Sequence, residues 1–384
     1  MILVFSPVKF SCTKDNLHQG LSIASHISGR SANLPILNNI LLQADVGGVR
    51  LTSTNLDLTV SCMIRAKVDQ PGGYTLPAKL LADYVGLLPD ERIDLDLLDT
   101  SVAVHCGSSK TKMHGLAASE FPAIPKVSGG ITYTVQAQSF DAALGQTLFA
   151  VSTSEARQIL TGAFLYFNGD TKTVTVAATD SYRLGEKSVP LVSETLGERK
   201  VVIPARTLAE LRRILSVLRS GVEAAENIDI ELTDNQIAFR CGSVELSSRT
   251  IDGVYPDYRQ IIPKTFTTEL ILERNALIQA VKRTALFSKN GLFDVRFEVR
   301  SEEKLLRLFA NDIGRGENEV TIEAEVMGNA NSITLNFRYL LDGAQALQTE
   351  KVHMKMIDAM NPCIILPHGQ EKTDYLYIVM PIRQ

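Results

Sequence analysis

The sequence predicts an α+β protein made of three tandem copies of one domain type, each with two helices and several antiparallel strands. One observation is an alternating strand that ends at Asn55, Asp180 and Asp312, which are spaced by 125 and 132 residues. Another is the length of 384 residues, which divides at this period into three domains large enough to bury their own cores. The expected domains are residues 1–128, 129–265 and 266–384.

Two further landmarks follow each of these strands in the same order. The first is a short apolar segment before a helix, at residues 76–79, 203–206 and 335–338. The second is another alternating strand, at residues 93–97, 228–232 and 352–356. Landmarks repeated in a fixed order are the signature of an array, whose function depends on the surface that the assembled domains present.

Each copy begins with an amphipathic helix, because apolar residues recur at helical spacing. These residues are Leu17, Leu21, Ala24 and Ile27 in copy one, Phe140, Leu144, Leu148 and Val151 in copy two, and Leu277, Val281 and Ala285 in copy three. A second helix follows the apolar landmark, where Pro77 and Pro204 are predicted in the first turn, since proline's missing N–H would be unpaired there. We expect the helices on one side of the sheet, and linkers at residues 126–130 and 262–268.

Composition and motifs exclude several classes of protein. Apolar residues make up 45% and charged residues 21% of the chain, as in globular proteins, and no run approaches the ~20 apolar residues of a membrane span. The five cysteines form no Cys-x-x-Cys pair, so we expect reduced, buried thiols in a reducing cytoplasm. The six histidines lack metal-ligand spacing and no phosphate-binding loop is present, so no metal or nucleotide cofactor is expected.

Basic residues on the helices are candidates for a surface that faces phosphates. Leucines form one stripe of the segment 206–219, while Arg206 and Arg213, seven residues apart, lie on another face. For any single helix, an ordinary solvated face is the alternative. Because the net charge is −4, the recurrence of basic residues favours phosphate contacts that are independent of sequence. The candidates are Arg30, Lys79, Arg206, Arg213, Lys282, Arg283 and Lys289.

The many strands raise the question of how their edges are covered, because exposed edges recruit other chains. The first and last of three tandem domains keep free edges. Pairing copy one of one chain with copy three of another would close the assembly. We therefore expect a head-to-tail closed ring.

Asp180 and Asp312 end strands, where catalytic carboxylates often lie. The equivalent residue of copy one is Asn55, and Asn or Asp at such positions commonly bonds the backbone of its own turn. We expect turn formation at all three positions. No nucleophile motif frames the Ser, His and Asp residues, so the sequence gives no support to an enzyme.

Four motifs occur in order along the chain: Leu34-Pro35-Ile36-Leu37, Ala178-Thr179-Asp180-Ser181-Tyr182-Arg183-Leu184, Tyr255-Pro256-Asp257-Tyr258-Arg259 and Val379-Met380-Pro381-Ile382-Arg383. With these motifs the chain resembles the beta sliding clamps of bacterial DNA polymerase III over essentially its whole length. The resemblance implies a homodimeric ring of six similar domains, with helices lining a hole for duplex DNA. It implies a non-catalytic processivity factor in the bacterial cytoplasm, at the nucleoid. The implied partners are the polymerase III alpha subunit, the clamp loader, repair polymerases, mismatch-repair proteins and ligase.

The resemblance also implies a pocket between domains two and three that takes a short linear peptide from these partners. Its residues here would be Arg157, Leu160, Thr179, Ser181, Tyr182, Arg183, Leu184, Pro256, Ile261, Asn336, Tyr339, Val379, Met380, Pro381, Ile382 and Arg383. Such apolar residues form an adaptable slot that Arg and Tyr orient at the rim. This chain has Ser181-Tyr182 where the family commonly has Gly-His, which predicts a bulkier pocket wall, and Gln260 where an Arg is often found.

For the dimer contact, the resemblance places Thr111 and Met113 of one chain opposite Leu286 and Phe287 of the other. A small Thr in place of a large apolar residue predicts a looser joint.

Two other classes of function stay open on the sequence alone. A protein–protein scaffold that never meets DNA would tolerate charge reversal at Arg206 and Arg213. A hydrolase or nuclease that uses Asp180 and Asp312 would show metal-dependent turnover that Asp180→Asn abolishes.

Overall fold

The structure is a computed structural model of the chain, and it describes residues 8–28, 34–98, 100–193, 197–220, 225–289, 291–369 and 374–383. The chain forms two compact units: residues 1–138 with 209–250, and residues 139–208 with 251–384. Both units combine helices with antiparallel sheets, so the predicted α+β class is confirmed.

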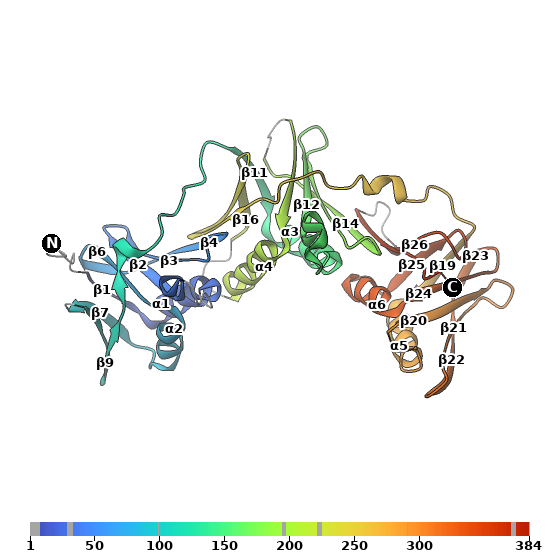
Figure 1. Cartoon of the computed structure of the whole chain (residues 1–384), viewed down its shortest axis with the longest axis horizontal. Helices are drawn as coiled ribbons and strands as arrows, with labels where there is room; N and C mark the ends of the chain where they lie inside the picture. Colours follow the sequence, from blue (N-terminus) through green and yellow to red (C-terminus); the bar gives the residue numbers. More distant parts are fainter. Residues whose placement is uncertain are drawn as a thin grey trace. The chain divides into compact units, whose positions relative to one another are not determined.

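Two sheets form the first unit (Figure 1). The smaller has five strands in the spatial order β5 (Lys67–Gln70), β1 (Lys9–Thr13), β7 (Arg92–Leu98), β8 (Ser101–Cys106) and β9 (Ser109–His114). The larger has nine strands in the order β10 (Leu116–Ala117), β6 (Gly72–Pro77), β2 (Asn39–Asp45), β3 (Gly48–Thr54), β4 (Leu58–Ile64), β18 (Val244–Arg249), β17 (Gln236–Cys241), β16 (Asn227–Leu232) and β11 (Ile131–Gln136).

Helices α1 (Lys14–Ala24) and α2 (Ala78–Leu87) of this unit lie side by side (Figure 1). Helix α1 packs on β3 and β4, while α2 packs on β2 and β6. Thr13 begins α1, because its hydroxyl accepts a hydrogen bond from the Asn16 N–H at 3.3 Å. Leu17, Leu21 and Ala24 of the predicted stripe are fully buried, whereas Ile27 lies beyond α1 in a 3₁₀ turn and is half-buried. Short 3₁₀ helices are η1 (Ser25–Ile27), η2 (Pro35–Asn38) and η3 (Ala118–Glu120).

The described residues of the second unit also form two sheets. The larger has nine strands in the order β15 (Glu198–Pro204), β12 (Gly162–Asn168), β13 (Thr173–Thr179), β14 (Arg183–Pro190), β27 (Tyr375–Val379), β26 (Cys363–Pro367), β25 (Lys351–Met356), β19 (Thr268–Glu273) and β23 (Glu325–Gly328). The smaller has four strands in the order β22 (Gly316–Glu323), β21 (Leu305–Asp312), β20 (Asp294–Arg300) and β24 (Asn331–Asn336).

Helices α5 (Arg274–Ala285) and α6 (Phe337–Ala346) of the second unit contact each other, and α5 packs on β21 and β22. Helices α3 (Ala137–Thr147) and α4 (Ala205–Ser220) cross the boundaries between the two units. The remaining 3₁₀ helices are η4 (Leu148–Ala150), η5 (Glu155–Thr161) and η6 (Tyr258–Ile261).

One strand pairing repeats between successive copies. Strand β4 of copy one pairs with β18 of copy two, where Leu58 lies opposite Ser248. Strand β14 of copy two pairs in the same way with β27 of copy three, where Arg183 lies opposite Val379. Each large sheet is therefore continuous from one copy to the next.

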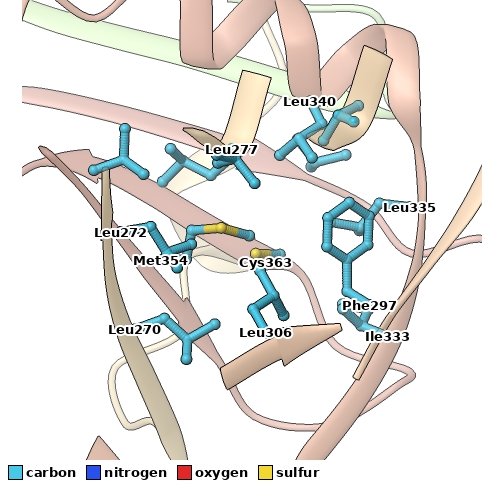
Figure 2. Close-up of a cluster of buried hydrophobic side chains, with 14 of the residues drawn as sticks. Leu270, Leu272, Leu277, Phe297, Leu306, Ile333, Leu335, Leu340, Met354 and Cys363 are labelled. Carbon is cyan, nitrogen blue, oxygen red and sulfur yellow. The ribbon is translucent and has the colours of Figure 1, made fainter. Parts of the chain in front are cut away.

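The core of the third copy shows how the predicted periodicities are used (Figure 2). Leu277 of α5 and Leu340 of α6 meet strand residues Leu272, Phe297 and Met354, and all five are at most 1% exposed. Burying a side chain of this size stabilises the fold by about 1.5–3 kcal/mol before entropy is counted.

Pro77 and Pro204 do not lie in the first helical turn, so that prediction is wrong by one position. Pro77 is the last residue of β6 and the N-cap of α2, with φ −56° and ψ 111°. Pro204 ends β15 immediately before α4. Both prolines still belong to a strand ladder, opposite Asn39 and Gly162. None of the helices in the described part of the chain is long and apolar enough to cross a membrane.

Candidate functional site

The three strand-ending residues Asn55, Asp180 and Asp312 form the same turn. In each copy the side-chain Oδ1 accepts hydrogen bonds from the backbone N–H groups two and three residues later, at 2.9–3.2 Å. The turn prediction is confirmed, because all three side chains bond the backbone of their own turn. Within the described ranges, no group of three or more His, Cys, Asp or Glu residues could hold a metal ion.

Copies one and two share this turn in more detail. The Thr54 and Thr179 hydroxyls accept hydrogen bonds from the N–H groups of Leu56 and Ser181, at 3.0 and 3.1 Å. Leu56 and Ser181 have φ of +78° and +79°. This left-handed conformation favours glycine and costs other residues about 1–2 kcal/mol. The turn therefore imposes the same backbone on two different side chains.

A cavity of about 620 Å³ lies beside the turn of copy two, within the second unit. Its lining comes from the segment around η5, from the turn, and from the first turns of α6. The lining residues are Val151, Ser152, Thr153, Ser154, Ala156, Arg157, Leu160, Asp180, Ser181, Tyr182, Arg183, Arg338, Tyr339 and Asp342. Leu160 is only 3% exposed and gives the cavity a buried apolar part.

Arg183 ties the turn to α6. Its Nε donates to Asp180 Oδ2 at 3.0 Å and its Nη1 donates to Asp342 Oδ2. Its guanidinium also lies over the Tyr339 and Phe149 rings, 4.5 and 5.6 Å from their centroids. Burial disfavours the charge, but Tyr377 and the two carboxylates outweigh burial and raise the pKa of Arg183. This side chain is a fixed part of the pocket wall.

The rim of the cavity is more exposed. The Arg157 Nη1 donates to the Ser181 hydroxyl at 3.2 Å, and both residues are exposed. Tyr182 also lines the cavity and is 63% exposed. Gln260 bonds Asp257 of its own segment at 2.9 Å.

The C-terminal segment is held against the same turn. The Met380 N–H donates to the Tyr182 carbonyl at 2.8 Å. Pro381 bridges to Leu335, and the Ile382 N–H donates to the Thr334 carbonyl at 2.8 Å. The last strand thus lies inside the large sheet, between β14 and β26, and its end contacts the turn that lines the cavity.

The structure brings many of the expected pocket residues together. Six of them line the cavity: Arg157, Leu160, Ser181, Tyr182, Arg183 and Tyr339. Of the others, Thr179 bonds the turn, Leu184 packs with Leu160, and Asn336 caps α6. Pro256 and Ile261 are exposed on either side of Tyr258, Val379 is buried in β27, and Arg383 is exposed at the end of the described chain.

Three charged residues of the cavity were absent from the expected pocket set: Asp180, which was predicted only as a turn residue, and Arg338 and Asp342. A signal for Asp342 existed, because it lies 132 residues after Glu210, the spacing that also separates Asp180 from Asp312.

Most of the basic candidates lie on exposed helical positions. The exposed ones are Lys79 in α2, Arg206 in α4, Lys282 and Arg283 in α5, and Lys289 after α5. Arg30 lies outside the described residues.

Arg213 is half-buried, and its guanidinium bonds groups of the chain itself. It donates to the Glu210 carboxylate at 2.7–3.1 Å, and to the Ser22 and Ile23 carbonyls of α1 at 2.7 and 2.6 Å. His26 Nδ1 also lies 2.8 Å from Glu210 Oε2. Arg213 therefore holds α4 against the end of α1, and this geometry does not support the expected phosphate-facing role.

The four residues expected at the dimer contact fall into two groups. Thr111 is half-buried in the edge strand β9, Leu286 is 67% exposed after α5, and Phe287 is half-buried. Met113 is only 4% exposed, because it faces the interior of its own unit. Its side chain therefore has almost no surface to offer a partner, contrary to expectation.

Family models for the N-terminal, central and C-terminal domains of the DNA polymerase III beta subunit match residues 8–125, 134–257 and 259–383. The chain belongs to the DNA polymerase III beta subunit family. Membership makes it a sliding clamp of DNA replication, a processivity factor without catalytic activity of its own. Three tandem clamp domains account for the triplication in the sequence.

Individual relatives match over nearly their whole length. The beta sliding clamp of Synechococcus elongatus is 34% identical over 382 residues, which cover 98% of this chain and 99% of that protein. The beta sliding clamp of Synechocystis is 33% identical over 398 residues, with the same coverage. The sliding clamp of Bacillus subtilis has a TM-score of 0.90 at 26% identity and covers 99% of this chain and 100% of its own. A Pseudomonas aeruginosa clamp bound to griselimycin has a TM-score of 0.91 at 26% identity, covering 98% and 100%.

Proposed function

We propose that the chain forms a head-to-tail homodimeric ring that encircles duplex DNA and tethers the replicative polymerase to it. The observation that carries this proposal is the presence of a sheet edge at each end of the domain array. Among the described strands, β9 is an edge in the first unit and β22 is an edge in the second. Joining two such edges between chains would give six domains, with boundaries near residues 128 and 265 of each chain, and would leave neither edge exposed.

The contact with DNA would be made by exposed basic residues on helices. Lys79, Arg206, Lys282 and Arg283 offer cations on exposed helical positions, and Lys289 offers one just after α5, in a chain whose net charge is −4. Cations that meet only phosphates attract DNA without reading its sequence, so a ring can slide. Arg30 stays in the proposed set, and Arg213 leaves it because its donors are used inside the chain.

The cavity beside the copy-two turn would receive a short peptide segment of partner proteins. Its apolar part at Leu160, the nearby Met380 segment and the fixed Arg183 and Tyr339 side chains suit a peptide with apolar anchors. The proposed partners are the polymerase III alpha subunit, the clamp loader, repair polymerases, mismatch-repair proteins and ligase. The place of action would be the cytoplasm, at the nucleoid.

Retention on DNA of different topology tests the ring. The purified protein is loaded onto nicked circular duplex with the cognate clamp loader and ATP, free protein is removed, and the circle is then cut once. Rapid loss after cutting, with stable retention on the uncut circle, is the expected result. Retention that does not change on cutting would mean backbone or groove binding and would contradict the ring.

Charge reversal tests the DNA-facing residues separately from the ring. Arg206→Glu with Lys282→Glu is expected to weaken loading and to make it more sensitive to salt. A scaffold that never meets DNA would show no change. Arg213 is unsuitable for this test, because its loss would disturb α1 and α4 directly.

Peptide binding tests the pocket. A fluorescein-labelled peptide with the clamp-binding segment of the polymerase III alpha subunit from the same bacterium is titrated with the full chain, and anisotropy is measured. Met380→Ala is expected to weaken binding about tenfold, as for an anchor contact worth about 1.4 kcal/mol. Met360→Ala is the matched control, because Met360 is 55% exposed and its N–H bonds Asp358 of its own segment, whereas the Met380 N–H bonds the lining residue Tyr182. Equal affinities for the two variants would count against the pocket.

A further inference from the structure

The hydroxyl of Ser181 is not needed by the turn that carries it. The turn is fixed by Thr179 and Asp180, whose side chains bond the backbone N–H groups of the next residues. Leu56 takes the same left-handed conformation in copy one without any hydroxyl. The Ser181 hydroxyl is therefore available for another role, and it accepts a hydrogen bond from Arg157.

That contact joins two walls of the cavity at its solvent-facing rim. Arg157 belongs to η5 and departs from helical geometry there, with φ −128° and ψ 79°. Ser181 belongs to the turn between β13 and β14. Both residues are exposed and line the cavity, whereas Leu160 forms its buried part.

The two arginines of this region are held very differently. Arg183 is 12% exposed and is fixed by two carboxylates and two aromatic rings. Arg157 is exposed and donates to one neutral hydroxyl at 3.2 Å. A single exposed bond of this kind opens at little cost, while the charge-assisted network of Arg183 does not. The cavity thus combines one rigid and one movable cation.

We propose that the Arg157–Ser181 hydrogen bond is a latch across the pocket rim, which must open before a partner peptide can seat against Leu160. The inference rests on the proposed peptide-binding function. The free energy needed to open the latch is subtracted from the binding free energy of every peptide. Ser181 therefore lowers all affinities by the same factor, and peptides that bind weakly fall below the affinity needed for binding.

Variants of Ser181 and Arg157 in the full chain test the latch with the same labelled alpha-subunit peptide. Ser181→Ala removes the hydroxyl but keeps the Cβ and the backbone strain. It is expected to tighten binding about twofold to tenfold, the effect of one such hydrogen bond, through faster association in stopped-flow measurements. In an Arg157→Ala background, Ser181→Ala is expected to leave the affinity unchanged. Ser181→Gly, which also relieves the strain, is the second variant if Ser181→Ala folds poorly.

Each other outcome decides against the latch. Unchanged or weaker binding by Ser181→Ala overturns it, and an equal gain with and without Arg157 shows that the hydroxyl acts on the peptide directly. Met380→Ala, measured in parallel, separates the two proposals. If Met380→Ala weakens binding while Ser181→Ala does nothing, only the latch fails. If no variant binds the peptide, the pocket and the latch fail together.

Discussion

Replacing Arg213 by alanine should destabilise the chain more than replacing Arg206, an exposed arginine of the same helix. The side chain donates to a carboxylate and to two carbonyls at the end of α1, and Glu210 is only 5% exposed. Without Arg213, the buried Glu210 carboxylate keeps its contact with His26 but loses its arginine partner. The Arg213→Ala substitution therefore removes one ion pair and also removes the hydrogen-bond donor of two backbone carbonyls.

The size of the effect follows from burial. Removing one partner of a fully buried ion pair costs about 3–5 kcal/mol. The Arg213 side chain is 25% exposed, so water replaces part of what is lost, and we expect about 2–3 kcal/mol. For a unit of this size, 1 kcal/mol moves the melting midpoint by about 2–4 °C, so the expected fall is roughly 4–12 °C.

Differential scanning calorimetry measures the shift, and amide exchange of α1 and α4 locates it. Arg206→Ala is the matched control on the same helix, because Arg206 is exposed and exposed charge contacts contribute below about 1 kcal/mol. Glu210→Gln completes a double-mutant cycle. The reasoning is refuted if the Arg213→Ala and Arg206→Ala variants have the same melting temperature. It is also refuted if the change in unfolding free energy of the double variant equals the sum of the changes caused by Arg213→Ala and Glu210→Gln.

Three other predictions concern separate parts of the chain. A Cβ on Gly343 would lie 2.1 Å from Cε1 of the buried Tyr377 ring, so Gly343→Ala should cost about 1–3 kcal/mol and lower the melting temperature. Burial, reinforced by Lys355, lowers the pKa of His353 from its ordinary 6.5, so the unfolded chain binds this proton more readily. The stabilisation that this residue gives above pH 6.5 should therefore be lost as the pH falls through its folded-state pKa. The free energy of unfolding, measured with denaturant at several pH values, should depend less on pH in the His353→Gln variant than in the original chain. The five cysteines are buried, and burial raises the pKa of the Cys363 thiol to about 12, so a thiol reagent at pH 8 should react only after unfolding.

The triplication and the fold class were predictable from sequence, because they depend on spacing and alternation alone. The turn at Asn55, Asp180 and Asp312 was predictable for the same reason, since a short polar side chain bonds its own backbone whatever packs around it. Local chemistry of this kind does not depend on which segments meet in space.

The features that were missed depend on tertiary contacts. Arg213 looks like an exposed basic residue on a helix, and only the approach of α1 shows that its donors are used. Met113 alternates correctly within β9, but sequence does not tell which face of an edge strand is inside. Pro77 was placed one residue too far into its helix, because the strand ladder that includes it continues to the helix boundary.

One position of the repeat contributes to the contact between successive copies twice, once between copies one and two and once between copies two and three. Glu210 of α4 and Asp342 of α6 lie 132 residues apart, at the same place in their helices. Both carboxylates hold their helix to the preceding copy, but Asp342 binds Arg183 of the turn, whereas Glu210 binds Arg213 of its own helix and His26. Because Arg183 belongs to the copy-two turn, its bond to Asp342 fixes that turn as a wall of the cavity. The two junctions thus share an acid at one position of the repeat but differ in its partner, and at the second junction that partner fixes the copy-two turn beside the cavity.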